Sequence, residues 1–60
     1  MKYDIIDLVV TAAGAVDELD IEQLQMLHDN AADMTECSEH ELVAYKNMLK
    51  SMMILVTNMV

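Results

Sequence analysis

Three stretches of the chain repeat one local pattern that is typical of a helix start. In each, a residue that favours the N-cap position stands three positions before an acid or amide that can reach back to the cap's own backbone N–H, which is the capping box. The three pairs are Asp4 with Asp7, Asp20 with Gln23, and Ser38 with Glu41. An apolar residue before each cap also faces a leucine at the fourth helical position, as in the hydrophobic staple. We therefore expect three helices, over about residues 5–17, 21–34 and 39–58.

The boundary between the first two predicted helices has the weakest signal. Residues 17–20 contain neither Gly nor Pro, the residues that most often end a helix. The cap at Asp20 predicts a break at this point, because an N-cap residue has a non-helical backbone. One bent helix is the alternative.

Two of the predicted helices carry more apolar surface than three short helices can cover. Polar residues of the first helix form only a narrow stripe, at Asp4, Asp7, Thr11, Gly14 and Glu18. The third helix has apolar residues at heptad spacing, and further apolar residues lie beside this seam. The seam is Leu42, Tyr45, Leu49, Met52, Val56 and Met59; beside it lie Met48, Met53, Leu55 and Val60, of which Met48 belongs to the predicted self-association or partner face. We predict an all-α, small three-helix bundle completed by homodimerisation through the third helix; a monomeric bundle with this helix as its spine is the alternative.

Composition supports the all-α class. The chain has no Pro, Phe or Trp and one Gly, so it lacks the turn and aromatic residues that all-β folds need. We expect a single acidic helical domain over residues 1–60. A chain of this length buries only about 60% of the surface that its unfolded form exposes. Because the one cysteine, Cys37, cannot form a disulfide within the chain, a partner is expected to add stability.

The charge of the chain is strongly and unevenly negative. Its formal net charge is -8, and all 11 acids lie from Asp4 to Glu41, a stretch without Lys or Arg. Such a surface repels nucleic acid and anionic membranes, because affinity for phosphates comes largely from Lys and Arg. The same field attracts basic protein surfaces. We expect a protein partner with a basic surface, and no direct binding to nucleic acid or membrane.

Carboxylates spaced three or four residues apart form the first candidate site. On a helix such pairs stand about 5–6 Å from one another, which is similar to the spacing of successive phosphates along a nucleic-acid strand. Because like-charged pairs at this spacing cost a helix about 0.2–0.5 kcal/mol each, binding explains them better than folding does. The residues of this predicted acidic face are Asp4, Asp7, Glu18, Glu22, Asp29, Asp33 and Glu36.

No motif of the chain predicts catalysis, a metal or a cofactor. The soft metal ligands are His28, Cys37 and His40, too few for the four Cys or His ligands of a structural zinc. The Glu-x-x-His motif of di-iron bundles does not occur, and no serine lies in a Gly-x-Ser-x-Gly turn. The methionines of the heptad face are expected to fill the core, and an adaptable binding surface is their other interpretation. We expect no enzyme activity and no cofactor.

These patterns favour a non-catalytic protein-binding regulator or inhibitor. Its acidic face would engage a basic, nucleic-acid-binding protein, in the manner of small acidic inhibitors of phages and mobile elements, some of them DNA mimics. The alternative is a helical assembly or adaptor module that binds a partner through the Met-rich apolar face of the third helix. The N-terminal region carries acids where a secretory signal is basic, and no apolar run approaches the roughly 20 residues of a membrane span, so we expect a cytoplasmic protein.

Overall fold

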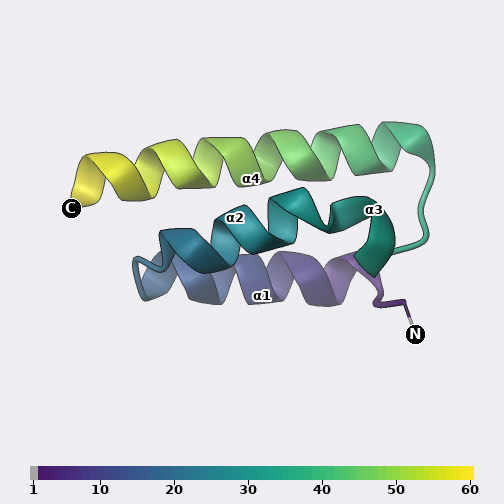
Figure 1. The fold of residues 1–60 in the computed structure, drawn as a ribbon, viewed down its shortest axis with the longest axis horizontal. Coiled ribbons are helices and arrows are strands. Elements are labelled where there is room, and N and C mark those ends of the chain that lie inside the picture. Colours follow the sequence, from purple (N-terminus) through teal and green to yellow (C-terminus); the bar gives the residue numbers. More distant parts are fainter. Residues whose placement is uncertain (1) are drawn as a thin grey trace.

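Residues 2–60 form four helices. The computed structural model describes residues 2–60, and its helices are α1 (Ile5–Asp17), α2 (Ile21–Asp29), α3 (Ala31–Met34) and α4 (Glu39–Met59). Figure 1 shows that α2 runs antiparallel to both α1 and α4, so that α1 and α4 run in the same direction. Within residues 2–60 the one β-type pairing is an isolated bridge between Tyr3 and Thr35. The predicted all-α class is confirmed.

The three predicted helix starts are confirmed, and each N-cap side chain accepts a hydrogen bond from a backbone N–H of its own helix. The distances are 3.1 Å from Ile6 N to Asp4 Oδ1, 3.1 Å from Gln23 N to Asp20 Oδ1, and 3.2 Å from Glu41 N to Ser38 Oγ. These bonds satisfy donors that a helix leaves unpaired at its N-terminus. They therefore fix where α1, α2 and α4 begin.

The turn between α1 and α2 separates the two helices without a glycine. Leu19 has a φ of 56°, in the left-handed region that favours glycine. Its N–H donates to the carbonyl oxygen of Val16 at 3.0 Å, and the N–H of Asp20 donates to that of Ala15 at 2.8 Å. This pair of bonds is a Schellman motif, which ends a helix by satisfying its last carbonyls. The predicted break is confirmed, and the alternative of one bent helix is wrong.

The predicted second helix, over residues 21–34, is wrong in its second half, because the helix breaks at Asn30. The Nδ2 of Asn30 donates to the carbonyl oxygen of Met26 at 2.9 Å, and the same oxygen accepts the Asn30 N–H at 3.1 Å. The Asn30 carbonyl oxygen accepts the N–H groups of Asp33 and Met34, at 3.0 and 2.9 Å. A side chain that bonds the preceding turn competes with the helical ladder. The chain therefore has a separate short helix, α3, in place of the end of the predicted helix.

The core lies where α2 packs against α1 on one side and against α4 on the other. The buried apolar residues come from all four helices and are Leu8, Ala12, Ala15, Leu24, Leu27, Ala31, Tyr45, Leu49 and Val56. The contacts of α2 with α1 and with α4 are both more extensive than the contact between α1 and α4. The two outer helices therefore leave an opening on the face of the bundle that α2 does not cover.

The heptad seam of α4 faces the chain's own core. Its buried residues are Tyr45, Leu49 and Val56, and its half-buried residues are Leu42 and Met52. Met59, near the C-terminal end, is 57% exposed. This placement corresponds to a bundle with α4 as its spine. Most of the seam is engaged within the chain and does not lie open to a second copy.

Candidate functional site

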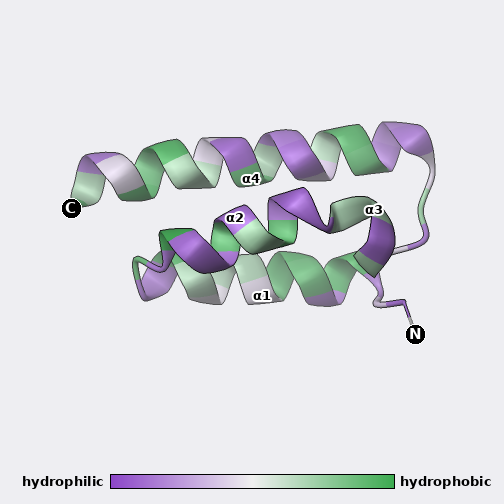
Figure 2. Ribbon diagram, in the orientation of Figure 1, coloured by the Kyte–Doolittle hydropathy of each residue, from purple (hydrophilic) through white to green (hydrophobic). Residues whose placement is uncertain are grey.

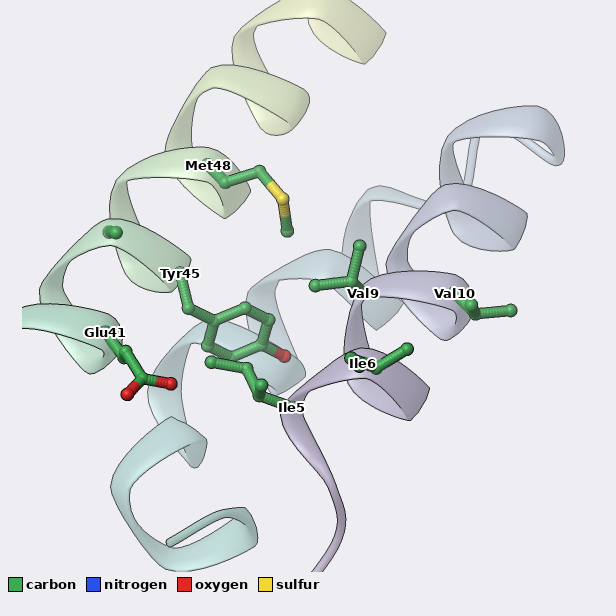
Figure 3. Close-up of a pocket in the computed structure, with 8 residues that line it drawn as sticks. Ile5, Ile6, Val9, Val10, Glu41, Tyr45 and Met48 are labelled. Carbon is green, nitrogen blue, oxygen red and sulfur yellow. The ribbon is translucent and has the colours of Figure 1, made fainter. Parts of the chain in front are cut away.

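An apolar groove runs between α1 and α4, and Figure 3 shows its walls. We name it the α1–α4 groove; its volume is about 390 Å³. Its lining residues are Ile5, Ile6, Val9, Val10, Glu41, Ala44, Tyr45 and Met48. Glu41 is the one charged side chain among them. A groove of this kind offers extensive apolar contact and very few polar groups to orient a small polar ligand.

The α1 wall of the groove presents large aliphatic side chains to solvent. Ile6 is 67% exposed and Val10 is 66% exposed. These two residues are four positions apart, so they lie one turn from each other on the same side of the helix, and the exposed Ala13 continues this side. Figure 2 shows hydrophobic residues along much of α1. Single exposed apolar residues are common, but a contiguous apolar ridge beside a groove is typical of a binding surface.

Tyr45 forms the inner part of the α4 wall. Its ring extends from α4 toward α1 (Figure 3) and is only 3% exposed. Within the described residues its hydroxyl has no hydrogen-bond partner. Burial raises the pKa of the Tyr45 hydroxyl above its usual value of 10.0, because a phenolate loses hydration in apolar surroundings. The ring therefore fills the space between the two helices and leaves one polar atom unsatisfied.

The outer part of the α4 wall continues toward the C-terminus. Leu55 follows Ala44 by 55 − 44 = 11 residues, which is about three helical turns, so both lie on the same side of α4. Leu55 is half exposed, and α4 extends past the end of α1 in Figure 1. Ile54, which is nine positions after Tyr45, lies on the opposite side of α4 at 63% exposure. The groove side and the far side of α4 can therefore be changed independently.

The residues of the predicted acidic face are all exposed, and two of their carboxylates take part in local structure. These seven residues are Asp4, Asp7, Glu18, Glu22, Asp29, Asp33 and Glu36. The Asp4 carboxylate caps α1. Asp29 Oδ1 accepts the amide N–H of Gln25 at 2.9 Å and lies 3.3 Å from His28 Nδ1. The remaining carboxylates are free of such bonds within residues 2–60 and face solvent.

The acids gather toward the two ends of the bundle, which we name the two acidic ends. The end that holds α3 and the starts of α1 and α4 carries Asp4, Asp7, Asp33, Glu36, Glu39 and Glu41, and the end at the α1–α2 turn carries Asp17, Glu18, Asp20 and Glu22 (Figure 1). Residues 8–16 of α1, between these ends, include no charged residue. Among residues 2–60 no lysine forms an ion pair with a carboxylate. The negative charge therefore lies mostly at the two ends of the bundle, and Glu41 is the acid that lines the α1–α4 groove.

The candidate metal ligands do not form a metal site in the described part of the chain. Residues 2–60 contain no group of three or more His, Cys, Asp or Glu side chains arranged to hold a metal ion. His28 is largely buried, with its Nδ1 beside Asp29 and its Nε2 without a partner, and Cys37 is a half-buried free cysteine. His40 is exposed in the first turn of α4.

The exposed wall of α1 is the part of the site that sequence reasoning missed. The narrow polar stripe of the first helix indicated surplus apolar surface, but it did not indicate which residues would stay uncovered. Ile6 and Val10 lie on the side of α1 that is turned away from α2, which only the packing of the bundle defines. The i, i+4 spacing of these two aliphatic residues, on a side of the helix without polar residues, is the sequence signal that could have located them.

Comparisons with protein-family models, with curated proteins and with solved structures find no match for this chain. Within residues 2–60, the helices are too short or too polar to cross a membrane. The function of the protein is therefore argued from its own residues and their geometry.

Proposed function

We propose that this protein is a non-catalytic protein-binding module that holds an apolar segment of another protein in the α1–α4 groove. The exposure of Ile6 and Val10, about two thirds each, carries this proposal, because the packing of residues 2–60 leaves most of both side chains uncovered. Grooves between helices commonly bind an apolar helix face of a partner. Met48, in the α4 wall, has a flexible side chain that can adapt to such a partner.

The acidic surface gives this module its preference for basic partners. A net charge of -8 raises the encounter rate with a positively charged surface, and the effect weakens as salt screens it. Because the acids gather at two ends of the bundle, they support electrostatic steering better than a continuous imitation of a phosphate strand. A regulator or inhibitor of a basic, nucleic-acid-binding protein, as phages and mobile elements encode, is the setting we propose; a DNA mimic is its more specific form.

Homodimerisation through α4 is the second arrangement that an observation favours. Leu55 and Met59 are exposed on the groove side of α4, where a second copy would find apolar contacts beyond those of α1. The buried residues of the seam would stay in the core of each copy. Light scattering tests this arrangement: a dimer has twice the mass of the 6.8 kDa chain.

Capture of partners from a cell lysate, followed by mass spectrometry, tests the proposed function when matched variants are compared. Val10→Glu places a charge on the groove wall, and Ile54→Glu places the same charge on the far side of α4 at nearly equal exposure. We expect Val10→Glu to abolish capture and Ile54→Glu to retain it. The double variant Asp29→Lys, Asp33→Lys should retain capture with a weaker dependence on salt.

The opposite pattern would contradict this proposal. If the Asp29→Lys, Asp33→Lys variant loses its partner while Val10→Glu keeps it, the acids are the binding surface and the groove is not. If all the variants capture the same proteins as the original chain, neither surface is the site.

A further inference from the structure

We infer that the segment held in the α1–α4 groove is an amphipathic helix with an apolar middle and Lys or Arg residues at both ends. This inference rests on the proposed function and adds the chemistry of the partner to it. It follows from how charge and apolar surface alternate along the groove.

The middle of the groove accepts only apolar side chains. On the α1 wall, Ile6, Val10 and Ala13 follow one another at helical spacing, and residues 8–16 carry no charge. On the α4 wall, Ala44 and Met48 line the groove, and Figure 3 shows Met48 across from Val9. A polar group placed there would lose its hydration without gaining a hydrogen bond, which is unfavourable. The segment that binds must therefore be apolar over the central turns that contact the groove.

An acid stands at each end of the surface that is formed by the groove and by the side of α1 that continues beyond it. Glu41 lines the groove near the start of α4. Asp17 follows Ile6 by 17 − 6 = 11 residues, about three turns, so it lies on the groove side of α1 at the opposite end. Neither of these carboxylates pairs with a lysine within residues 2–60. Basic residues at both ends of a bound helix would meet an unpaired acid at each end.

The length of this surface sets the spacing of these basic residues. The α1 residues that line the groove lie within residues 5–10, and the same side of the helix continues to Asp17, so the 13 residues of α1 give at about 1.5 Å each a surface of roughly 20 Å. A bound helix of three to four turns covers that length. Its Lys or Arg residues would then be separated by about 13 residues, with apolar residues at i, i+4 and i+7 between them.

A second copy of the chain fits the groove less well than a basic helix. The groove lining of each copy offers Glu41 and no lysine, and each copy has a net charge of -8. Two copies packed through this face would bring carboxylates together without compensating charge. A helix with basic ends gains from the same carboxylates. Charge complementarity therefore selects a basic protein as the partner.

A designed peptide tests this inference directly. The probe is a fluorescein-labelled helical peptide of about 18 residues, with leucines on one face and lysines at both ends. The matched peptide has glutamates in place of the lysines. Fluorescence anisotropy should give a Kd at least about tenfold lower for the lysine-ended peptide at low salt, with the difference reduced at high salt. Val10→Glu should raise its Kd about tenfold or more, and Ile54→Glu should change it less than about twofold.

A charge reversal at one end separates the ends of the groove from the general field. Asp17→Lys and Glu22→Lys change the net charge equally and lie at the same end of the bundle, but only Asp17 is on the groove side. We expect Asp17→Lys to weaken binding of the lysine-ended peptide and to strengthen binding of the glutamate-ended peptide. Glu22→Lys should change the binding of both peptides less. Thermal unfolding of each variant verifies that the fold is kept.

Two results would overturn the inference, and they differ from failure of the proposed function. Equal binding of the two peptides, still sensitive to Val10→Glu, would show an apolar groove without charge preference, and the proposed function would stand. A dimer that Val10→Glu dissociates, with no binding of either peptide, would place a second copy in the groove. The proposed function itself would be contradicted if Val10→Glu captured the same proteins from a lysate as the original chain does.

Discussion

α1 and α2 lie side by side, yet α1 exposes an apolar surface to solvent and α2 exposes a mostly polar one. Both bury aliphatic residues toward the core: Leu8 on α1, and Leu24 and Leu27 on α2. On its outer side α2 carries mostly polar residues, namely Glu22, Gln25 and Asp29, with Ile21 and Met26 about 40% exposed. On its groove side α1 exposes Ile6, Val10 and Ala13.

The difference shows which apolar residues folding requires. A helix needs one apolar face to pack in a bundle, and α2 has little more than that. α1 has a second apolar face that contributes little to the core. Because exposed aliphatic residues reduce solubility without stabilising the fold, the outer face of α1 supports the proposed binding function.

The largest effect is expected when a buried leucine of α2 is removed. Leu24 is fully buried, so Leu24→Ala leaves a cavity in the core and should lower the free energy of unfolding by about 2–5 kcal/mol. That is a large part of the total stability of a small domain. Urea unfolding followed by circular dichroism measures it. A loss below about 1 kcal/mol would mean that α2 is not the centre of the core.

A smaller effect is expected at the start of α2. Asp20→Ala removes the acceptor of the Gln23 N–H bond and should lower the free energy of unfolding by about 1 kcal/mol. Asp20→Asn is the matched control, because asparagine is an equally good N-cap without the charge. If both variants lose the same stability, the charge of Asp20 matters and its cap does not. Urea unfolding again provides the measurement.

Tyr45 connects the groove with the core through the pH dependence of stability. Because burial raises the pKa of Tyr45 in the folded chain, both states are protonated below about pH 10, and the stability it contributes is fully present there. Above that pH the unfolded chain ionises first, so the free energy of unfolding falls as pH rises toward the folded pKa. Tyr45→Phe should reduce this alkaline loss and, by removing an unsatisfied hydroxyl, should leave neutral stability equal or higher.

Thermal unfolding of the original chain and of the Tyr45→Phe variant across the alkaline pH range measures the difference in their loss of stability. All other residues are the same in the two proteins, so only the contribution of Tyr45 differs between them. An identical alkaline loss in the two proteins would show that Tyr45 is hydrated in the folded chain.

The smallest effect on stability is expected on the outer face of α1. Ile6→Ser with Val10→Ser gives α1 a polar exterior like that of α2, and should change the free energy of unfolding by only about 0.5 kcal/mol per site, because both side chains are mostly exposed. The same variant should lose binding of the lysine-ended peptide. A loss of several kcal/mol would mean that this face supports folding, and the contrast between α1 and α2 would disappear.

The helix starts could be predicted from the sequence because capping is a local interaction. Asp4, Asp20 and Ser38 bond to residues two or three positions away, so their role depends on no other part of the chain. The heptad spacing also predicted which residues of α4 would be apolar neighbours. It did not determine whether the chain's own helices or a second copy would cover them.

The break at Asn30 and the groove required the structure. Asn30 was expected inside a helix. Its side chain can adopt several conformations, and only one of them forms the hydrogen bond to the Met26 carbonyl oxygen, so the sequence alone does not predict the break. The groove depends on how far α1 stands from α4, and that distance follows from the packing of α2 between them. Ile6 and Val9 have similar apolar side chains, but only their positions on the bundle make one exposed and the other half-buried.

The left-handed backbone of Leu19 makes the turn between α1 and α2 dependent on the rest of the molecule. This conformation costs a residue with a side chain about 1–2 kcal/mol. A hairpin of α1 and α2 alone, with helices of 13 and 9 residues, has little with which to offset that cost, since helices of this length are marginal in water. In the whole chain, the packing of α2 against α4 offsets it. The bundle is therefore expected to fold and unfold as one cooperative unit. A state in which α4 has detached while the hairpin of α1 and α2 stays folded should not be populated.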